Sequence, residues 1–84
     1  MTKYSIKVLK KARKFIISQP KDRQKQLFDA IKKLPDIGDI ASMQGRSGTY
    51  RLRVGGYRVL FTKDDKILKV RVIDAGNRGD VYKG

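Results

Sequence analysis

Two adjacent glycines, Gly55 and Gly56, separate two stretches in which apolar and polar residues alternate. The stretches Thr49–Val54 and Tyr57–Lys63 are typical of β-strands, because successive side chains of a strand point to opposite faces. A two-residue connection rich in glycine is a preferred loop of a β-hairpin, and it fixes the register of the strands that it joins. The predicted pairs are Val54 with Tyr57, Arg53 with Arg58 and Leu52 with Val59.

A third alternating stretch, Ile67–Asp74, follows the dipeptide Asp64-Asp65, where we expect a second hairpin turn. The predicted register pairs Phe61 with Leu68, Val59 with Val70, Arg58 with Arg71 and Tyr57 with Val72. One face of the sheet then collects the apolar side chains and should form the core: Tyr50, Leu52, Val54, Tyr57, Val59, Phe61, Leu68, Val70 and Val72.

The opposite face of this sheet is basic. In the predicted register Arg53, Arg58 and Arg71 form one row across three strands, with no acidic residue on that face, and directly opposed like charges destabilise a sheet. Such a row is expected where a ligand supplies the counter-charge, because guanidinium groups match the geometry of phosphate and carboxylate. The alternative is a solvated sheet face that happens to be basic. The full predicted face holds Arg51, Arg53, Arg58, Lys69 and Arg71, with Leu60 and Ile73.

The first part of the chain predicts one strand and two helices. Tyr4–Val8 alternates like a strand, and from Leu9 the apolar residues recur at helical spacing until Ser18-Gln19-Pro20. A second helix should begin at Pro20 and end at Pro35, and the short connection predicts an antiparallel pair. Its apolar stripe consists of Leu27, Phe28, Ile31 and Leu34, which we expect to pack with Phe15 on the core face of the sheet.

Residues 35–48 carry Pro, Gly and Asp without periodicity, and we expect a loop there. The order β-α-α-β-β-β predicts an α+β domain over residues 1–84, with an antiparallel-rich sheet and a helical hairpin on one face. Gly76 and Gly79 allow the end of the chain to bend back, so that Arg78 and Tyr82 reach the basic face.

The net charge and the absence of two residue types limit the functions that this chain can have. The 21 Lys and Arg outnumber the 8 Asp and Glu, for a formal net charge of +13, which favours a polyanionic partner such as RNA or an acidic protein. Because Cys and His are absent, we expect no metal site, no cofactor and no imidazole base. No apolar run approaches the roughly 20 residues that span a bilayer. The simplest location is the cytoplasm.

Two segments resemble the RelE/ParE superfamily of toxins from bacterial and archaeal toxin–antitoxin modules. They are Tyr50–Phe61, with its Gly-Tyr-Arg turn, and Val72–Tyr82, with its Gly-x-Arg and Val-Tyr ending. The resemblance implies the RelE-like microbial RNase fold, a cognate antitoxin that blocks the toxin, and, for RelE-type members, metal-independent cleavage of mRNA in the ribosomal A site. It places phosphate binding and proton transfer on Arg51, Arg53, Arg58, Arg78 and Tyr82. We assign further RNA contacts to Lys69, Arg71 and Asn77.

The sequence departs from the family pattern at the positions that would move protons. Arg51 and Arg53 stand where active members often carry Lys, and Asn77 stands where many carry His. Arginine stays protonated and is a poor general base. Three functions therefore remain open: a ribosome-dependent endoribonuclease, a ParE-like inhibitor of DNA gyrase, and a non-catalytic basic binding module.

Overall fold

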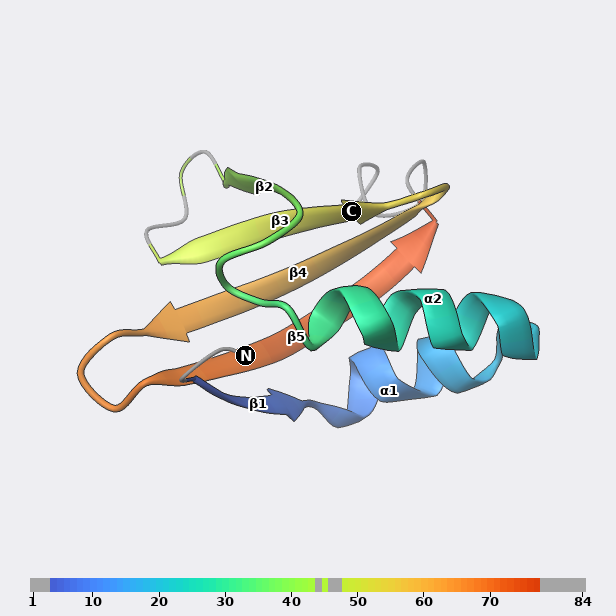
Figure 1. Ribbon diagram of the computed structural model, residues 1–84, viewed down its shortest axis with the longest axis horizontal. Helices are drawn as coiled ribbons and strands as arrows, with labels where there is room; N and C mark the ends of the chain where they lie inside the picture. The colour runs from blue at the N-terminus through green and yellow to red at the C-terminus, as the bar shows by residue number, and fades with distance from the viewer. Residues whose placement is uncertain (1–3, 44, 46–47, 78–84) are drawn as a thin grey trace.

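The computed structural model describes residues 4–43, 45 and 48–77. Two helices cover one face of a five-stranded sheet (Figure 1). In the part of the chain described, the elements are β1 (Ser5–Val8), α1 (Lys10–Ile17), α2 (Lys21–Ile31), β2 (Asp39–Ser42), β3 (Thr49–Val54), β4 (Tyr57–Asp64) and β5 (Lys69–Asn77). The α+β architecture with a helical hairpin on one face is thus confirmed.

The sheet has the order β1-β5-β4-β3-β2. Strand β1 pairs parallel with β5, and the other neighbours pair antiparallel. The expectation of a loop over residues 35–48 was wrong in part, since Asp39–Ser42 forms the edge strand β2 on β3. Gly38 makes this path possible: its φ is 135°, and a Cβ there would lie 2.7 Å from Leu52 Cδ1, so a larger residue would clash with the core.

The helices form where the apolar periodicity predicted them. Side chains form hydrogen bonds with the backbone of the short connection between α1 and α2. Gln24 Nε2 donates to the backbone oxygens of Ile17 at 3.2 Å and Gln19 at 2.8 Å, while Ser18 Oγ donates to Phe15 O at 2.6 Å. Ile17 is the last residue of α1, so the bond to its carbonyl satisfies one of the groups that a helix C-terminus leaves without an intrahelical partner. Helix α2 ends at Ile31, earlier than the predicted Pro35, and Leu34 is nevertheless fully buried from the turn that follows.

The core lies between the helices and the sheet. Six residues of the predicted core face are buried, at 7% exposure or less: Leu52, Val54, Val59, Phe61, Val70 and Val72. They cluster with Ala12, Ile16, Leu27, Ile31 and Leu34, and Phe15 packs against this cluster from its edge. Leu68 was wrongly placed in the core, because it lies in the β4–β5 turn and is 41% exposed.

The first predicted hairpin is confirmed. Arg53 lies opposite Arg58 and Leu52 opposite Val59, with Val54 and Tyr57 closing the pair. Gly55 has a φ of 58°, and glycine is favoured at this first central position because a positive φ there matches the twist of the hairpin.

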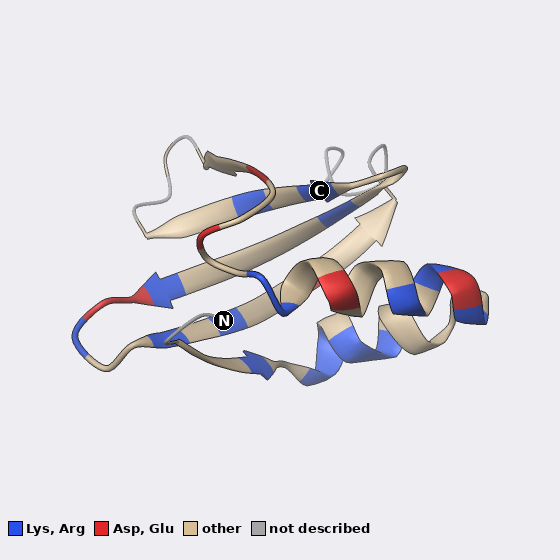
Figure 2. Ribbon diagram, in the orientation of Figure 1, with Lys and Arg blue, Asp and Glu red and all other residues tan. Residues whose placement is uncertain are grey.

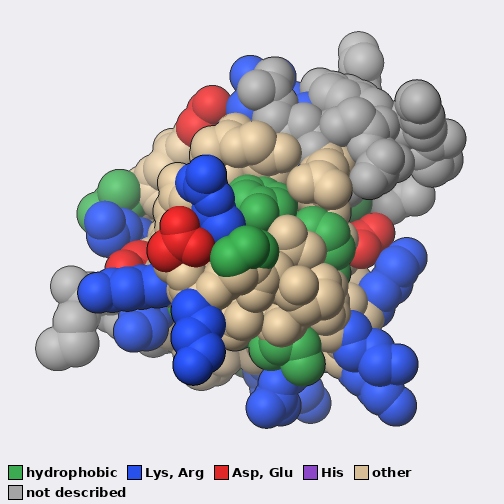
Figure 3. Space-filling view, turned by 90° about the vertical axis from the view of Figure 1, so that its right-hand side faces the viewer, with side chains coloured by type: hydrophobic (Ala, Val, Ile, Leu, Met, Phe, Trp, Pro, Cys, Tyr) green, Lys and Arg blue, Asp and Glu red, His purple; other side chains and the backbone are tan. Residues whose placement is uncertain are grey.

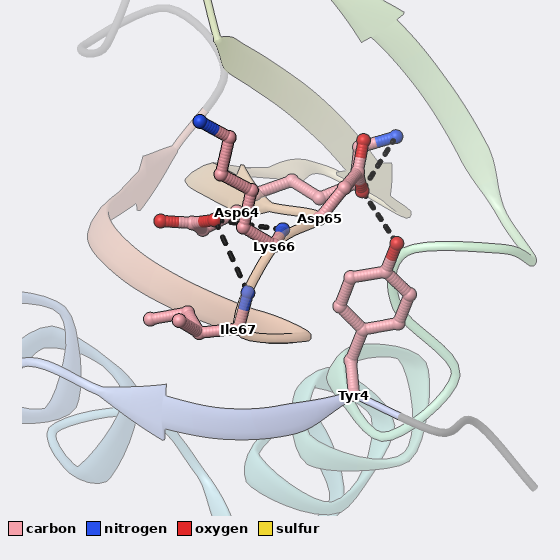
Figure 4. Close-up of polar contacts among 6 residues, drawn as sticks. Tyr4, Asp64, Asp65, Lys66 and Ile67 are labelled. Carbon is pink, nitrogen blue, oxygen red and sulfur yellow. Dashed lines mark hydrogen bonds and ion pairs between the residues drawn. The ribbon is translucent and has the colours of Figure 1, made fainter.

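The predicted register of the second hairpin was wrong, because its turn is longer than the Asp64-Asp65 dipeptide. Figure 4 shows how the turn is held: Asp64 Oδ1 accepts the backbone N–H of Lys66 at 2.9 Å and of Ile67 at 3.4 Å. Tyr4 from the chain before β1 donates its hydroxyl to Asp65. Leu68 then turns the chain with a φ of 52°, and β5 begins only at Lys69. In consequence Phe61 faces Val72, and an irregularity at Leu60/Phe61 puts Val59 opposite Ala75.

No helix within residues 4–43, 45 and 48–77 is long and apolar enough to cross a membrane.

Candidate nucleic-acid interface

The face of the sheet turned away from the helices is called the open face below. Because Leu52, Val54 and Val59 point to the helices, the alternate residues Arg51, Arg53 and Arg58 belong to the open face. Arg53 and Arg58 are directly opposite each other, and Arg51 is opposite Leu60. These three residues, the arginine cluster, therefore come together as the sequence predicted.

The arginine cluster is partly withdrawn from solvent. Arg58 is 1% exposed, and Leu60 on the same strand is 6% exposed although it does not belong to the core between helices and sheet. Arg51 and Arg53 are half-buried. Among the described residues, Arg53 Nε is buried without a hydrogen-bond partner. An anion can supply the hydrogen bond that Arg53 Nε lacks among these residues, and charges attract more strongly where water is excluded.

The third member of the predicted row does not join the cluster. Arg71 lies opposite Thr62, and Gly76 takes the place opposite Arg58. The cause is the long β4–β5 turn, which shifts β5 along β4. Arg71 is instead beside Lys7 of β1, its partner across the parallel ladder. The basic residues of the open face thus form two groups, one on β3 and β4 and one on β1 and β5.

Acidic residues also reach the open face, contrary to the prediction. Asp39 of β2 lies opposite Arg53, and Asp64 lies opposite Lys69. Asp39 was missed because β2 was expected to be loop. Neither Asp39 nor Asp64 forms an ion pair within 4.0 Å among the residues that the structure describes. The arginine cluster accordingly has a carboxylate at its border, on the edge strand.

Three other predicted site residues stand apart from the arginine cluster. Asn77, the last residue of β5, is exposed and lies opposite Tyr57, so the register puts it on the helix-facing side and not on the open face. Arg78 and Tyr82 lie outside the described residues.

Tyr57 ties the arginine-bearing hairpin to the helices. Its hydroxyl donates to Gln19 Oε1 at 3.0 Å, and its ring meets that of Phe15 edge-on at 5.9 Å. Figure 3 views this end of the molecule, where hydrophobic side chains come to the surface in small groups and Lys and Arg project mainly from the left and lower rim. Since Tyr57 precedes Arg58 and points to the opposite face, this contact supports the strand that carries Arg58. No sequence pattern predicted the pairing of Tyr57 with Gln19.

Positive charge covers both layers of the molecule. Figure 2 shows Lys and Arg on β1, β3, β4, β5 and both helices, whereas Asp, within the described ranges, is confined to α2, the connections and single positions of β2, β4 and β5. Two ion pairs lie outside the arginine cluster: Lys11 Nζ to Asp74 Oδ2 at 3.4 Å and Lys63 Nζ to Asp65 Oδ1 at 3.8 Å. The hydrogen bond to Asp65 is the main cause that raises the pKa of the Tyr4 hydroxyl to about 12. Desolvation of the hydroxyl and the negative charges of Asp65 and Asp36 shift this pKa in the same direction.

Comparison with known proteins gives a family and a fold. The family model described as the ParE toxin of type II toxin–antitoxin systems, parDE, matches residues 1–80. No curated protein sequence matches this chain. A RelE–RelB complex from the archaeon Pyrococcus horikoshii is similar in structure, with a TM-score of 0.75 and 26% identity over 94% of this chain and 98% of that one.

Two further structures support the same fold. The RelB–RelE complex of Methanococcus jannaschii has a TM-score of 0.74 at 20% identity, over 92% of this chain and 95% of that one. The isolated RelE toxin of Escherichia coli has a TM-score of 0.74 at 23% identity, over 95% of this chain and 92% of that one.

Proposed function

We propose a molecular activity for this chain from one premise: it belongs to the ParE toxin family of type II toxin–antitoxin systems. The resemblance found in the sequence is thereby confirmed, and the chain is a toxin of such a module. The activity that we propose is ribosome-dependent endonucleolytic cleavage of mRNA. The observation that carries this proposal is the arginine cluster, because Arg53 and Arg58 face each other across one ladder and can hold a single phosphate between them.

In the proposed reaction the ribose 2′-oxygen attacks the adjacent phosphorus while the bond from phosphorus to the 5′-oxygen breaks. The products are a 2′,3′-cyclic phosphate and a 5′-hydroxyl, so the 2′-hydroxyl loses a proton and the leaving oxygen gains one. Arg53 and Arg58 hold the phosphate and stabilise the charge that develops on its oxygens. By the family resemblance, Arg78 faces the leaving oxygen and Tyr82 stacks on a base or orients the 2′-hydroxyl.

The proposal assigns the toxin mainly the task of positioning. Arg51 adds positive charge beside the phosphate, and neither it nor Asn77 takes up a proton at neutral pH. Alignment of the 2′-hydroxyl with the scissile bond contributes several kcal/mol in reactions of this kind, at about the scale of measured effective molarities. Proton removal then falls to the ribosome, the RNA or water.

A cognate antitoxin is the expected protein partner. Two of the similar structures are RelE–RelB complexes, and the net charge of +13 favours an acidic or amphipathic segment that covers the basic surface. Binding should therefore weaken with salt. Equal affinity at low and high ionic strength for the protein encoded beside the toxin would contradict the electrostatic part of this proposal.

A second candidate function is inhibition of DNA gyrase without nuclease chemistry. The matching family model is that of ParE, and the missing proton acceptor among Arg51, Arg53 and Asn77 fits a toxin that does not cleave RNA. The two functions differ in what the toxin acts on, and one pair of assays separates them.

The test uses ribosomes programmed with a defined A-site codon, incubated with the toxin and analysed by primer extension. We expect a cut within the A-site codon that needs the ribosome and tolerates a metal chelator. A supercoiling assay with purified gyrase runs in parallel. Absence of the cut together with loss of gyrase activity would refute the nuclease proposal and support the alternative.

A further inference from the structure

We propose that the open face holds a second phosphate-binding site, formed by Lys7 of β1 with Lys69 and Arg71 of β5, which contacts the RNA several nucleotides from the scissile phosphate. The inference rests on the proposed nuclease function and adds to it a defined path for the RNA. Lys7 was not among the predicted site residues, because its place depends on the parallel pairing of β1 with β5. This group is called the edge cluster below.

The edge cluster is a site by itself and not an extension of the arginine cluster. Arg58 lies opposite Gly76 and Arg71 opposite Thr62, which places them four residues apart along β4 and five along β5, a separation of roughly 15 Å at about 3.3 Å per residue. Between them the open face carries the buried Leu60 opposite Asp74. A single phosphate cannot contact both clusters.

The edge cluster concentrates like charge without a neutralising partner. Lys7 and Arg71 face each other across the ladder, an arrangement that destabilises a sheet. Asp64 lies opposite Lys69, but its Oδ1 accepts two backbone N–H groups of the β4–β5 turn. Within the described part of the chain, none of the three cationic side chains forms an ion pair.

Edge protection explains only one of these residues. A lysine on an edge strand discourages pairing with another chain, and Lys7 on β1 fits that role. Strand β5 lies inside the sheet between β1 and β4, so Lys69 and Arg71 have no edge to protect. Both are half-buried, and Arg71 is flanked by Thr62, whose hydroxyl can also bond a phosphate oxygen. The combination of a guanidinium, two ammonium groups and a hydroxyl suits a phosphate.

Both clusters belong to one face, so a single RNA strand can cross from one to the other. The separation of roughly 15 Å corresponds to about four or five stacked nucleotides at 3.4 Å each, and to fewer where the strand is extended. An RNA that reaches only the arginine cluster should therefore bind without the edge cluster, and a longer RNA should engage both.

The test measures binding of the full-length toxin to RNA that it cannot cleave, a 2′-O-methyl trinucleotide and a 2′-O-methyl octanucleotide, over a range of salt. The variant Lys7→Gln/Arg71→Gln removes two charges while it keeps most of the side-chain volume. The control Lys32→Gln/Lys33→Gln removes two exposed charges after α2. For the octanucleotide we expect the edge variant to lose at least tenfold in affinity at low salt. The slope of log K against log salt should fall by about 0.7, since the edge cluster binds one phosphate and each phosphate contact contributes about 0.7.

The trinucleotide should bind the edge variant and the native toxin equally, and the control should keep the native slope. Circular dichroism confirms that both variants are folded. The proposal would be overturned if the edge variant bound the octanucleotide with the salt dependence of the native toxin. It would also be overturned if the edge variant lost the same affinity for both RNA lengths. A third contrary result is an edge variant that binds RNA as the native toxin does and loses affinity only for the antitoxin, because the edge cluster would then bind an acidic protein. Failure of the nuclease proposal shows separately, as the absence of an A-site cut by the native toxin.

Discussion

The substitution Arg58→Ala tests the arginine cluster most directly. Arg58 is 1% exposed and lies between Arg53 on β3 and Gly76 on β5. If its guanidinium stabilises charge that develops on the phosphate, its removal should lower the cleavage rate by about a hundredfold or more, or roughly 2.7 kcal/mol of transition-state stabilisation.

The same substitution should leave the toxin folded. Alanine deletes two methylenes from a buried side chain, which costs about 1.6 kcal/mol at roughly 0.8 kcal/mol each. It also removes the repulsion from Arg53 directly opposite, which offsets up to about 1 kcal/mol. The repulsion from Arg71 that the sequence predicted does not contribute, since Arg71 faces Thr62. The net loss of roughly 0.6 to 1.6 kcal/mol is small beside a typical stability of about 5–15 kcal/mol.

The assay is single-turnover cleavage on programmed ribosomes, quantified by primer extension, with urea unfolding of the same preparations. Arg58→Lys is the matched variant, because it keeps the charge and loses the bidentate fork; we expect it to lie between Arg58→Ala and the native toxin. Arg71→Ala should raise KM with little change in kcat, since it contacts RNA away from the reacting atoms. A folded Arg58→Ala toxin within fivefold of the native rate would refute the assigned role.

Three further predictions follow from the same structure. Arg51→Lys should preserve or raise cleavage in the primer-extension assay, because a lysine placed among arginines has its pKa lowered toward neutrality and can accept a proton; a hundredfold loss would contradict this. Val59→Asp should prevent folding, because Val59 is fully buried and pairs with Ala75 inside the core; a cooperative melt would show that the register is wrong. Tyr4→Phe should have a lower free energy of unfolding in urea than the native toxin at pH 9. The raised pKa of Tyr4, about 12 against an ordinary 10.0, means that the hydrogen bond stabilises fully below pH 10 and is lost toward pH 12. The difference from the native toxin should therefore shrink as the pH rises, and a constant difference would contradict it.

The sequence predicted most of the structure where local chemistry allowed one solution. Gly55-Gly56 permitted a two-residue hairpin, which set the register of β3 and β4 and brought Arg53 to Arg58. The helices followed from apolar periodicity, since only one face of each can be buried.

The failures have a common cause in contacts between distant residues. The β4–β5 turn depends on the hydrogen bonds of Asp64 and on Leu68 in a conformation that leucine rarely adopts, and neither follows from propensity. Strand β2 is too short to predict, and it exists because β3 offers an edge. The edge cluster required the parallel pairing of β1 with β5, which sequence order does not specify.

The carboxylate that β2 brings to the arginine cluster decides how the site uses its charge. Asp39 lies opposite Arg53 and is exposed, so it can either accept the proton of the 2′-hydroxyl or compete with phosphate for Arg53. We expect competition, because the exposed carboxylate of Asp39 attracts the guanidinium of Arg53 and repels a phosphate.

Asp39→Asn should accordingly tighten RNA binding at low salt by severalfold and change the cleavage rate by less than fivefold. Because the chain has no histidine, the toxin should also add no ionisation to the rate between about pH 5.5 and 7. The measurement is the single-turnover cleavage rate from pH 4.5 to 8 on programmed ribosomes. The ratio of the rates of the native toxin and Asp39→Asn removes the pH dependence that comes from the ribosome. A hundredfold loss of cleavage rate in Asp39→Asn would instead make Asp39 the base. The toxin would then supply the proton acceptor that its arginines cannot.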